Sequence, residues 1–209
     1  MVAAAIRLFG ERGVKGTSLK AIAAEAGVSP ALIVHHFGSK EGLQRACDEH
    51  LLEVVRTNKQ QVIATEARMD PLAVLGQIEQ SRPLLRYLAR TLTDGGAHVT
   101  ELIDEMVADA EDYLGAGEEA GLIKPSATPR ERVVVLVIWA LGALALHEHV
   151  HRLLGVDFLE TGTGPAGLAP YLRPVLELYA QGLAEEGAFS QLIDLVDATA
   201  TDGPERTKR

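Results

Sequence analysis

The sequence predicts an all-α fold with a small three-helix head at the N-terminus and a larger helical body. Of the 209 residues, 47% are hydrophobic but only 4% are aromatic. Ala and Leu, both strong helix formers, dominate the apolar set. Ser, Thr, Pro and Gly recur where helices begin and end, and no strand-like alternation or internal repeat interrupts this pattern.

The head is expected to hold three short helices, over residues 2–12, 19–26 and 30–36. Thr17 and Ser18 are N-cap candidates for the second helix. Gly27 stands where the following turn needs a left-handed residue, and Ser29 with Pro30 begins the third helix in the preferred order of cap and first residue.

The body is expected to begin with a long helix that Ser39 caps and that reaches residue 67 or 69. Residues 81–83, which include a proline, are expected to break the next element. Further helices are expected over 84–93, 99–120, 130–154, 169–186 and 189–198, with a mobile loop at 155–167. The resulting domains are 1–45 for the head, 46–198 for the body and 199–209 for a disordered tail.

The charge distribution permits a nucleic-acid partner although the formal net charge of the chain is -9. Residues 1–45 hold six basic and three acidic groups, so the head is net positive and the acidic excess lies in the body. A phosphate backbone responds to the local positive charge, because distant charges are screened at cellular salt.

Residues 17–40 fit a helix-turn-helix that binds duplex DNA. Two short helices flank a tight Ala-Gly-Val-Ser turn, and the second helix starts with the short side chains of Ser29, Pro30 and Ala31. Such a start lets the backbone approach base edges in the major groove, which is about 12 Å wide. A small shared core is expected from Leu19, Ile22, Ala23, Val28, Ile33 and Phe37.

The same stretch resembles the TetR family of transcription regulators. The matching residues are Ala4 to Phe9, Gly13, Thr17, Ser18, Ile22, Ala23, Ala26 to Ser29, His35 to Lys40 and Leu43. The match covers about the first quarter of the chain. The resemblance implies a homodimeric repressor whose head binds a near-palindromic operator and whose body binds a small-molecule effector.

The resemblance also assigns DNA contacts. They are Thr17, Ser18, Ser29, Pro30, Ala31, Leu32, Val34, His35, His36 and Lys40. Among them, Thr17, Ser18 and Lys40 match phosphate contacts. Thr17 and Ser29 also suit plain capping roles, His35 and His36 also suit solvated or structurally hydrogen-bonded positions, and Lys40 also suits a surface charge. The family usually has Tyr at the position of Val34, and the contact of the tyrosine ring with the DNA backbone is therefore missing. The chain begins inside the family's usual first helix, so either a basic arm is trimmed from it or arm contacts are absent.

In the body, residues with an expected role in effector binding are Tyr87, Met106, Tyr113, Trp139 and His147. A place in the core is an equal alternative for Tyr87, Met106 and Tyr113, and the favoured one for Trp139. The resemblance implies that helices 130–154 and 169–186 pair with those of a second subunit. Leu176, Tyr179 and Leu183 form one stripe on the last long helix and are the expected dimer contacts.

A competing pattern is His147-Glu148 followed by His151, which matches H-E-x-x-H. Its i, i+4 spacing places both histidines on one helical face, as a zinc site requires. No third ligand is identifiable, so we expect no metal, no cofactor and no enzymatic activity. A metal-dependent enzyme remains one alternative, and a helical ligand-binding protein without DNA binding is the other.

The single cysteine, Cys47, excludes an intrachain disulfide and is expected to be a small core residue. The presence of only one cysteine and the lack of a signal peptide predict a cytoplasmic protein. The longest apolar run, residues 133–146, is shorter than the roughly 18 residues of a membrane span. It predicts a helix buried on most sides, and no membrane partner is expected.

Overall fold

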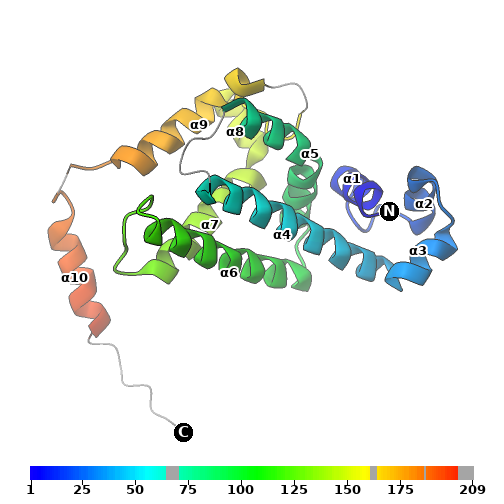
Figure 1. Cartoon of the computed structure of the whole chain (residues 1–209), viewed down its shortest axis with the longest axis horizontal. Coiled ribbons are helices and arrows are strands. Elements are labelled where there is room, and N and C mark those ends of the chain that lie inside the picture. Colours follow the sequence, from blue (N-terminus) through cyan, green and yellow to red (C-terminus); the bar gives the residue numbers. More distant parts are fainter. Residues whose placement is uncertain (65–70, 161–163, 186, 202–209) are drawn as a thin grey trace, which may run out of the picture. The chain divides into compact units, whose positions relative to one another are not determined.

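The computed structural model describes residues 1–64, 71–160, 164–185 and 187–201, and every regular element in these ranges is an α-helix (Figure 1). The helices are α1 (Val2–Arg12), α2 (Leu19–Ala26), α3 (Pro30–Phe37), α4 (Lys40–Ala64), α5 (Pro71–Asp94), α6 (Ala97–Glu119), α7 (Pro129–Ala145), α8 (His147–Leu154), α9 (Gly164–Gln181) and α10 (Ser190–Thr201). The predicted all-α class is confirmed. The chain forms two compact units, Met1–Leu168 and Ala169–Arg209.

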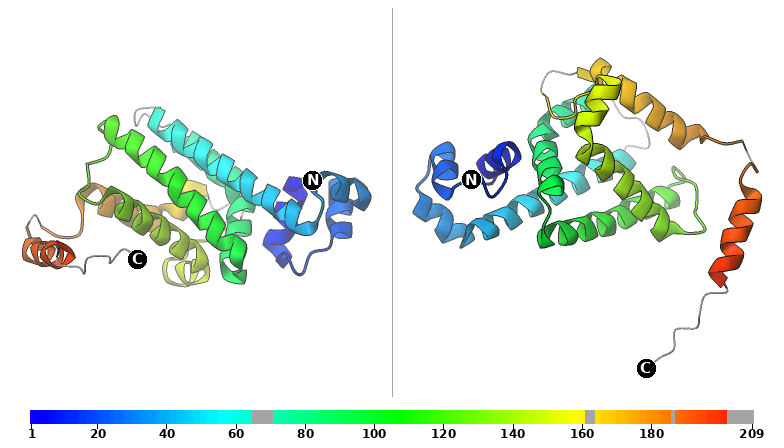
Figure 2. Two further views of the ribbon diagram at one scale, coloured as in Figure 1. Left: turned by 90° about the horizontal axis from the view of Figure 1, so that it is seen from below. Right: turned by 180° about the vertical axis from the view of Figure 1, so that it is seen from behind.

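Helix α1 belongs to the head and to the body at once. It packs against α2 and α4 on one side and against α5 on the other (Figures 1 and 2). The contact with α5 is close, since a Cβ atom added to Gly10 would lie 3.0 Å from the backbone nitrogen of Tyr87. Only glycine therefore lets the two backbones approach this far without a shift.

Tyr87 connects three helices at this junction. Its ring centroid lies 6.4 Å from that of Phe9 on α1, and its hydroxyl donates a 2.6 Å hydrogen bond to Oδ1 of Asp48 on α4. Burial raises the pKa of the Asp48 carboxyl, against the opposing effect of this hydrogen bond. Next to Asp48, Cys47 is fully buried as predicted, and burial raises the pKa of its thiol to about 12.

Helices α4 and α6 lie side by side in the body (Figures 1 and 2). Arg56 on α4 joins them through a bidentate pair with Asp109, with nitrogen–oxygen distances of 2.9 and 3.1 Å. On the other side of α6, Arg130 and Arg132 at the start of α7 form ion pairs with Glu111 and Glu118. These pairs fix the register of α4, α6 and α7.

The expected break at residues 81–83 is wrong, because α5 continues through Pro83. A proline inside a helix removes one backbone hydrogen bond and crowds the preceding turn, so the surroundings must offset it. Arg82 and Leu84 on either side of Pro83 are both buried. The burial of α5 between α1 and α7 thus outweighs the local preference for a break.

The single helix expected over 130–154 is also wrong, since α7 and α8 are bent by 73° at Leu146. Helix α7 buries Val133, Val137, Leu141 and Leu144 on one face. Its opposite face exposes Val135, Ile138 and Trp139, so the apolar run is not buried on most sides. Among the described residues no single helix is long and apolar enough to cross a membrane, and only the bent α7–α8 pair passes that test jointly.

The C-terminal elements differ from the expectation mainly in their boundaries. Helix α9 begins at Gly164, inside the segment expected to be a loop, and it ends at Gln181 rather than near residue 186. Helix α10 extends to Thr201 and so includes the first residues of the expected tail. The remaining tail, 202–209, and the expected end of the fourth helix, 65–69, lie outside the described residues.

We expect Gly10→Ala to lower the free energy of unfolding by about 1–3 kcal/mol, because the added methyl group forces the backbones of α1 and α5 apart. Urea unfolding measures this loss. The matched control is Gly115→Ala, at an exposed position within α6 where a Cβ meets nothing within 4 Å. That substitution should stabilise by about 0.5–1 kcal/mol, and equal effects of the two variants would contradict the close approach.

Candidate functional site

The head presents α3 as an exposed helix anchored by one side. Ile33 is fully buried, whereas the exposed side chains of α3 include the apolar Leu32 and Val34, the latter 47% exposed. His35 and His36 are exposed as well, with ring centroids 5.5 Å apart. Exposed apolar residues on both flanks of the buried Ile33 suit contact with another surface, such as base edges and thymine methyl groups.

The turn before α3 has the geometry that its sequence predicts. Gly27 adopts the left-handed conformation, with φ 66° and ψ 31°, and the N–H of Val28 donates to the carbonyl of Ala23 at 2.9 Å. The Ser29 hydroxyl oxygen then accepts from the N–H of Leu32 at 3.2 Å, which makes Ser29 the N-cap of α3. Ser29, Pro30 and Ala31 are exposed at this helix start.

Ser18 is the N-cap of α2, where its side chain accepts from the N–H of Ala21 at 3.1 Å. Thr17 is instead buried, and its hydroxyl lies 2.8 Å from the carbonyl oxygen of Gly13 and 3.1 Å from that of Leu8. The Thr17 side chain therefore points into the head, as its alternative structural role requires, and we do not include it among the proposed phosphate contacts. It locks the end of α1 to the start of α2.

Lys40 has a similar anchoring role. Its Nζ donates to the carbonyl of Val14 at 2.9 Å and lies 3.3 Å from that of Thr17, so α4 holds the turn between α1 and α2. An ammonium group has three N–H donors, which leaves one for a phosphate. Ser39 caps α4 as predicted, by accepting from the N–H of Gly42 at 3.0 Å.

The predicted effector residues do not come together. Tyr87 is buried at the junction of α1, α4 and α5, and Met106 and Tyr113 on α6 are partly buried against the core. Trp139 is 63% exposed on α7, so it is not the core residue that the sequence favoured. His147 lines a cleft.

That cleft, which we call the α8 cleft, has a volume of about 680 Å³. It lies between α1, α5 and the bend from α7 to α8. Its walls include Gly10 and Glu11 from the head and Arg86, Ala89 and Arg90 from α5. Volumes of about 300–1,000 Å³ are typical of small-molecule sites.

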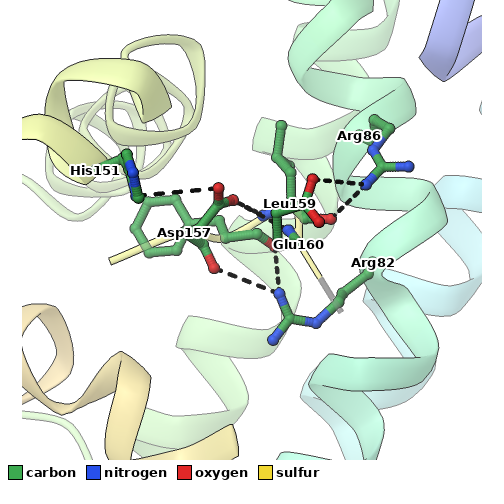
Figure 3. A network of polar contacts seen from close by, with 7 residues as sticks. Arg82, Arg86, His151, Asp157, Leu159 and Glu160 are labelled. Atoms are coloured by element: carbon green, nitrogen blue, oxygen red, sulfur yellow. Dashed lines mark hydrogen bonds and ion pairs between the residues drawn. The ribbon is translucent and has the colours of Figure 1, made fainter. Parts of the chain in front are cut away.

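Several residues that line the α8 cleft, among them Arg86 and Asp157, belong to a polar network that the sequence did not reveal (Figure 3). Arg82, 2% exposed, donates from Nη1 to the carbonyl oxygens of Asp157 and Phe158 at 3.4 and 3.2 Å. One turn further along α5, Arg86 donates from Nη2 to the carbonyl of Leu159 at 2.7 Å. The two arginines thus pin the segment after α8 to α5.

Asp157 shapes this segment from within, because its Oδ1 accepts from the N–H groups of Leu159 and Glu160 at 2.8 and 3.0 Å. Its Oδ2 lies 4.0 Å from Nδ1 of His151 (Figure 3). No sequence motif marks these contacts, since most of the acceptors are backbone carbonyls about 75 residues away from the arginines.

The H-E-x-x-H residues do not gather ligands around them. Glu148 and His151 are exposed on α8, and the described part of the chain holds no group of three or more His, Cys, Asp or Glu side chains that fits a metal ion. Residues 147–151 instead contribute to the rim of the α8 cleft through His147, Glu148 and His149.

A helix-turn-helix on a helical body defines the class of a DNA-binding regulator, and comparison with known proteins identifies the family. The model of bacterial regulatory proteins of the tetR family matches residues 1–47, and the model of the tetracyclin repressor-like C-terminal domain matches residues 79–184. The chain belongs to the TetR family and is a transcriptional regulator with a helix-turn-helix DNA-binding domain. The resemblance drawn from the head is confirmed, and the metal-dependent enzyme is excluded.

Relatives match over different lengths. The HTH-type transcriptional regulatory protein RaaS of Mycobacterium tuberculosis is 38% identical over 194 residues, which cover 89% of this chain and 86% of RaaS. The HTH-type transcriptional regulator BetI of Brucella anthropi is 50% identical over 52 residues, 25% of this chain and 27% of BetI. The second match is thus no longer than the head and the start of α4.

Solved structures support the fold at low sequence identity. The regulator PfmR from Thermus thermophilus aligns with a TM-score of 0.52 and 18% identity over 88% of this chain and 95% of its own. A structure described as the molecular basis for control of antibiotic production by bacterial hormones aligns with a TM-score of 0.57 and 18% identity, over 87% and 94% of the two chains.

We expect Thr17→Val to lower the free energy of unfolding by about 1–3 kcal/mol, because the carbonyls of Leu8 and Gly13 lose their buried donor. Urea unfolding measures this loss. Thr93→Val is the control, since its exposed hydroxyl only bonds back within α5. A Thr17 variant that kept full stability but lost salt-dependent DNA affinity would restore the phosphate role.

Proposed function

We propose that this regulator is a homodimeric repressor that binds a near-palindromic operator and releases it when a small-molecule effector binds. Residues 1–45 form the DNA-binding domain in this proposal and residues 46–198 the effector and dimerisation domain. The protein acts in the cytoplasm, where bacterial operators are accessible. The observation that carries the proposal is the exposed face of α3, a helix whose opposite side is buried through Ile33.

The proposed DNA contacts follow from the geometry of the head. Pro30, Ala31, Leu32, Val34 and His35 face the major groove, and Ser29 lies at the helix start that enters it. Ser18, His36 and Lys40 contact the flanking phosphates. Val34 in place of the family's usual Tyr supplies an apolar contact rather than a hydrogen bond.

The proposed effector site is the α8 cleft, because one of its walls is α1 of the head. A ligand there contacts Gly10 and Glu11 together with α5 and the α7–α8 bend, including His147. An effector that prefers one position of α1 relative to α5 changes the spacing of the two recognition helices in a dimer. Small molecules that release the protein from its operator should therefore bind the protein more weakly when His147 is replaced by a bulkier side chain.

The proposed dimer contacts are the apolar faces that the subunit leaves uncovered. On α7 these are Val135, Ile138 and Trp139, and on α9 they include Leu176 and Tyr179. Leu183 is 90% exposed, just beyond the end of α9. Large apolar side chains gathered on the exposed face of one helix, as on α7 and separately on α9, are typical of homodimer interfaces.

Selection of bound duplexes from a random DNA library at fixed salt tests the DNA-binding proposal. We expect a palindrome whose half-site centres are one helical turn of DNA, about 34–36 Å, or a multiple of that distance apart. His35→Ala should relax one base position in each half-site and weaken binding by about 1–3 kcal/mol. His50→Ala, an exposed change on α4 outside the head, is the control. Failure of the parent chain to enrich any sequence, even at low salt, would favour a helical ligand-binding protein without DNA binding.

Trp139→Glu should convert the dimer to a monomer, because it places an unpaired charge in the proposed interface. Sedimentation or light scattering of the purified protein measures the mass, and circular dichroism verifies that the helices persist. Leu122→Glu, at an exposed leucine between α6 and α7, is the matched control and should stay dimeric. A monomeric parent protein, or a Trp139 variant that remains dimeric, would contradict this interface.

A further inference from the structure

A second cleft lies on the other side of the head–body junction, with a volume of about 360 Å³. We call it the junction cleft. Its walls come from three parts of the subunit: the head contributes Phe9, Val14 and Lys15, the start of α4 contributes Lys40, Glu41 and Gln44, and the ends of α5 and α6 contribute Arg90, Thr91, Asp94, Gly95, Gly96 and His98. Of the sites proposed above, only the DNA contact of Lys40 and the α8 cleft, through Arg90, share residues with this cleft.

Two buried nitrogen atoms of the junction cleft lack a hydrogen-bond partner. They are Nε2 of Gln44 and Nε2 of His98. Gln44 as a whole is only 9% exposed. An amide Nε2 is always a donor, and the imidazole Nε2 donates in one neutral tautomer and in the cation. A buried donor without a partner costs about 1–3 kcal/mol, so such a pair in one cleft indicates a missing acceptor.

The start of α6 adds further donors to the same cleft. Its N-cap is Gly96, with φ 122°, and no side chain caps the first N–H groups of the helix. Uncapped amides at a helix N-terminus attract anions through hydrogen bonding and the helix dipole. His98 lies in the first turn of this helix, and both it and Gly96 line the junction cleft.

The charges around the junction cleft also favour an anion. Lys15, Lys40 and Arg90 line it, against the carboxylates of Glu41 and Asp94, and the Asp48 carboxyl interacts with His98 from behind the lining. Both carboxylates already have partners: Asp94 forms an ion pair with Arg90 at 3.0 Å. Hydrogen bonds from its own backbone N–H and from Ser39 lower the pKa of Glu41, which places its charge at the start of α4. Lys15 is exposed at the rim and supplies a mobile positive charge.

We propose that the junction cleft is a second ligand site, which binds the carboxylate or phosphate group of a small metabolite through Gln44, His98, the start of α6 and Lys15. The ring of Phe9 and the side chain of Val14 contact the apolar part of that ligand. Bound there, the oxyanion bridges the head, α4 and the α5–α6 turn, and it restricts the movement of the head relative to the body. Arg90 lines both this cleft and the α8 cleft, so the two ligands influence each other through one side chain.

Isothermal titration calorimetry of the full chain, without DNA, tests the site. Inorganic phosphate and benzoate are titrated at constant ionic strength, with chloride as the reference anion. We expect at least one of them to bind in a saturable manner with a stoichiometry of one per subunit. Phosphate alone indicates a phosphorylated metabolite, and benzoate alone indicates an organic carboxylate with an apolar body. If neither binds above chloride, the two nitrogens are satisfied by water and the proposal is wrong.

Two variants connect binding to the cleft. Gln44→Met removes the buried donor at similar volume. Lys15→Met removes the charge from an exposed position, so it should not affect folding. Each variant should raise the dissociation constant of the anion about tenfold or more. The matched controls are Gln80→Met, at an exposed position of α5, and Lys20→Met on α2, neither of which lines the cleft. Anion binding that is equally strong in Lys15→Met and Lys20→Met would overturn the proposal. Because no DNA is present, this outcome is independent of whether the operator proposal holds.

Discussion

At Gly10 the backbone of α1 meets the backbone of α5 with no side chain between them. Phe9 beside it packs on Tyr87, and Tyr87 in turn donates to Asp48 on α4. Three helices from both parts of the subunit are therefore fixed at one point by a close contact, an aromatic pair and a buried hydrogen bond. A DNA-binding head joined in this way moves with α1, because α1 is as much a part of the body's core as of the head.

The two clefts lie on either side of this junction and share Arg90. The α8 cleft is lined by the segment that Arg82 and Arg86 hold, whereas the junction cleft is lined by the start of α4 and the α5–α6 turn. Small changes on either side are transmitted as a shift of α1, since packed helices deform little internally. Both clefts thus have walls formed in part by α1 or the turn after it, and in our proposals a ligand in either one contacts the head.

The head was predictable from the sequence and the body much less so. Caps and turns in the head depend on residues a few positions apart, so Ser18, Gly27 and Ser29 indicate their own conformations. In the body the deciding contacts are distant. Burial carries α5 through Pro83, and α8 turns away from α7 at Leu146, where no proline or glycine marks the bend.

Individual side chains show the same limit. The type and position of Thr17 and Lys40 suggested DNA contacts, but their carbonyl partners in the fold were invisible in the sequence. Trp139 has the character of a core residue, and its exposure on α7 depends on which face the bundle leaves open. Gln44 and His98 are ordinary residues in sequence and become notable only because the fold buries their nitrogens in the wall of one cleft.

The buried thiol of Cys47 has a practical consequence. With its pKa raised to about 12 and no exposed surface, it reacts with alkylating reagents only when the packing around it opens. It is the only cysteine of the chain and lies next to Asp48, the acceptor of Tyr87 at the junction of head and body. Its rate of alkylation therefore reports how often this junction opens, and mass spectrometry measures that rate without any added label.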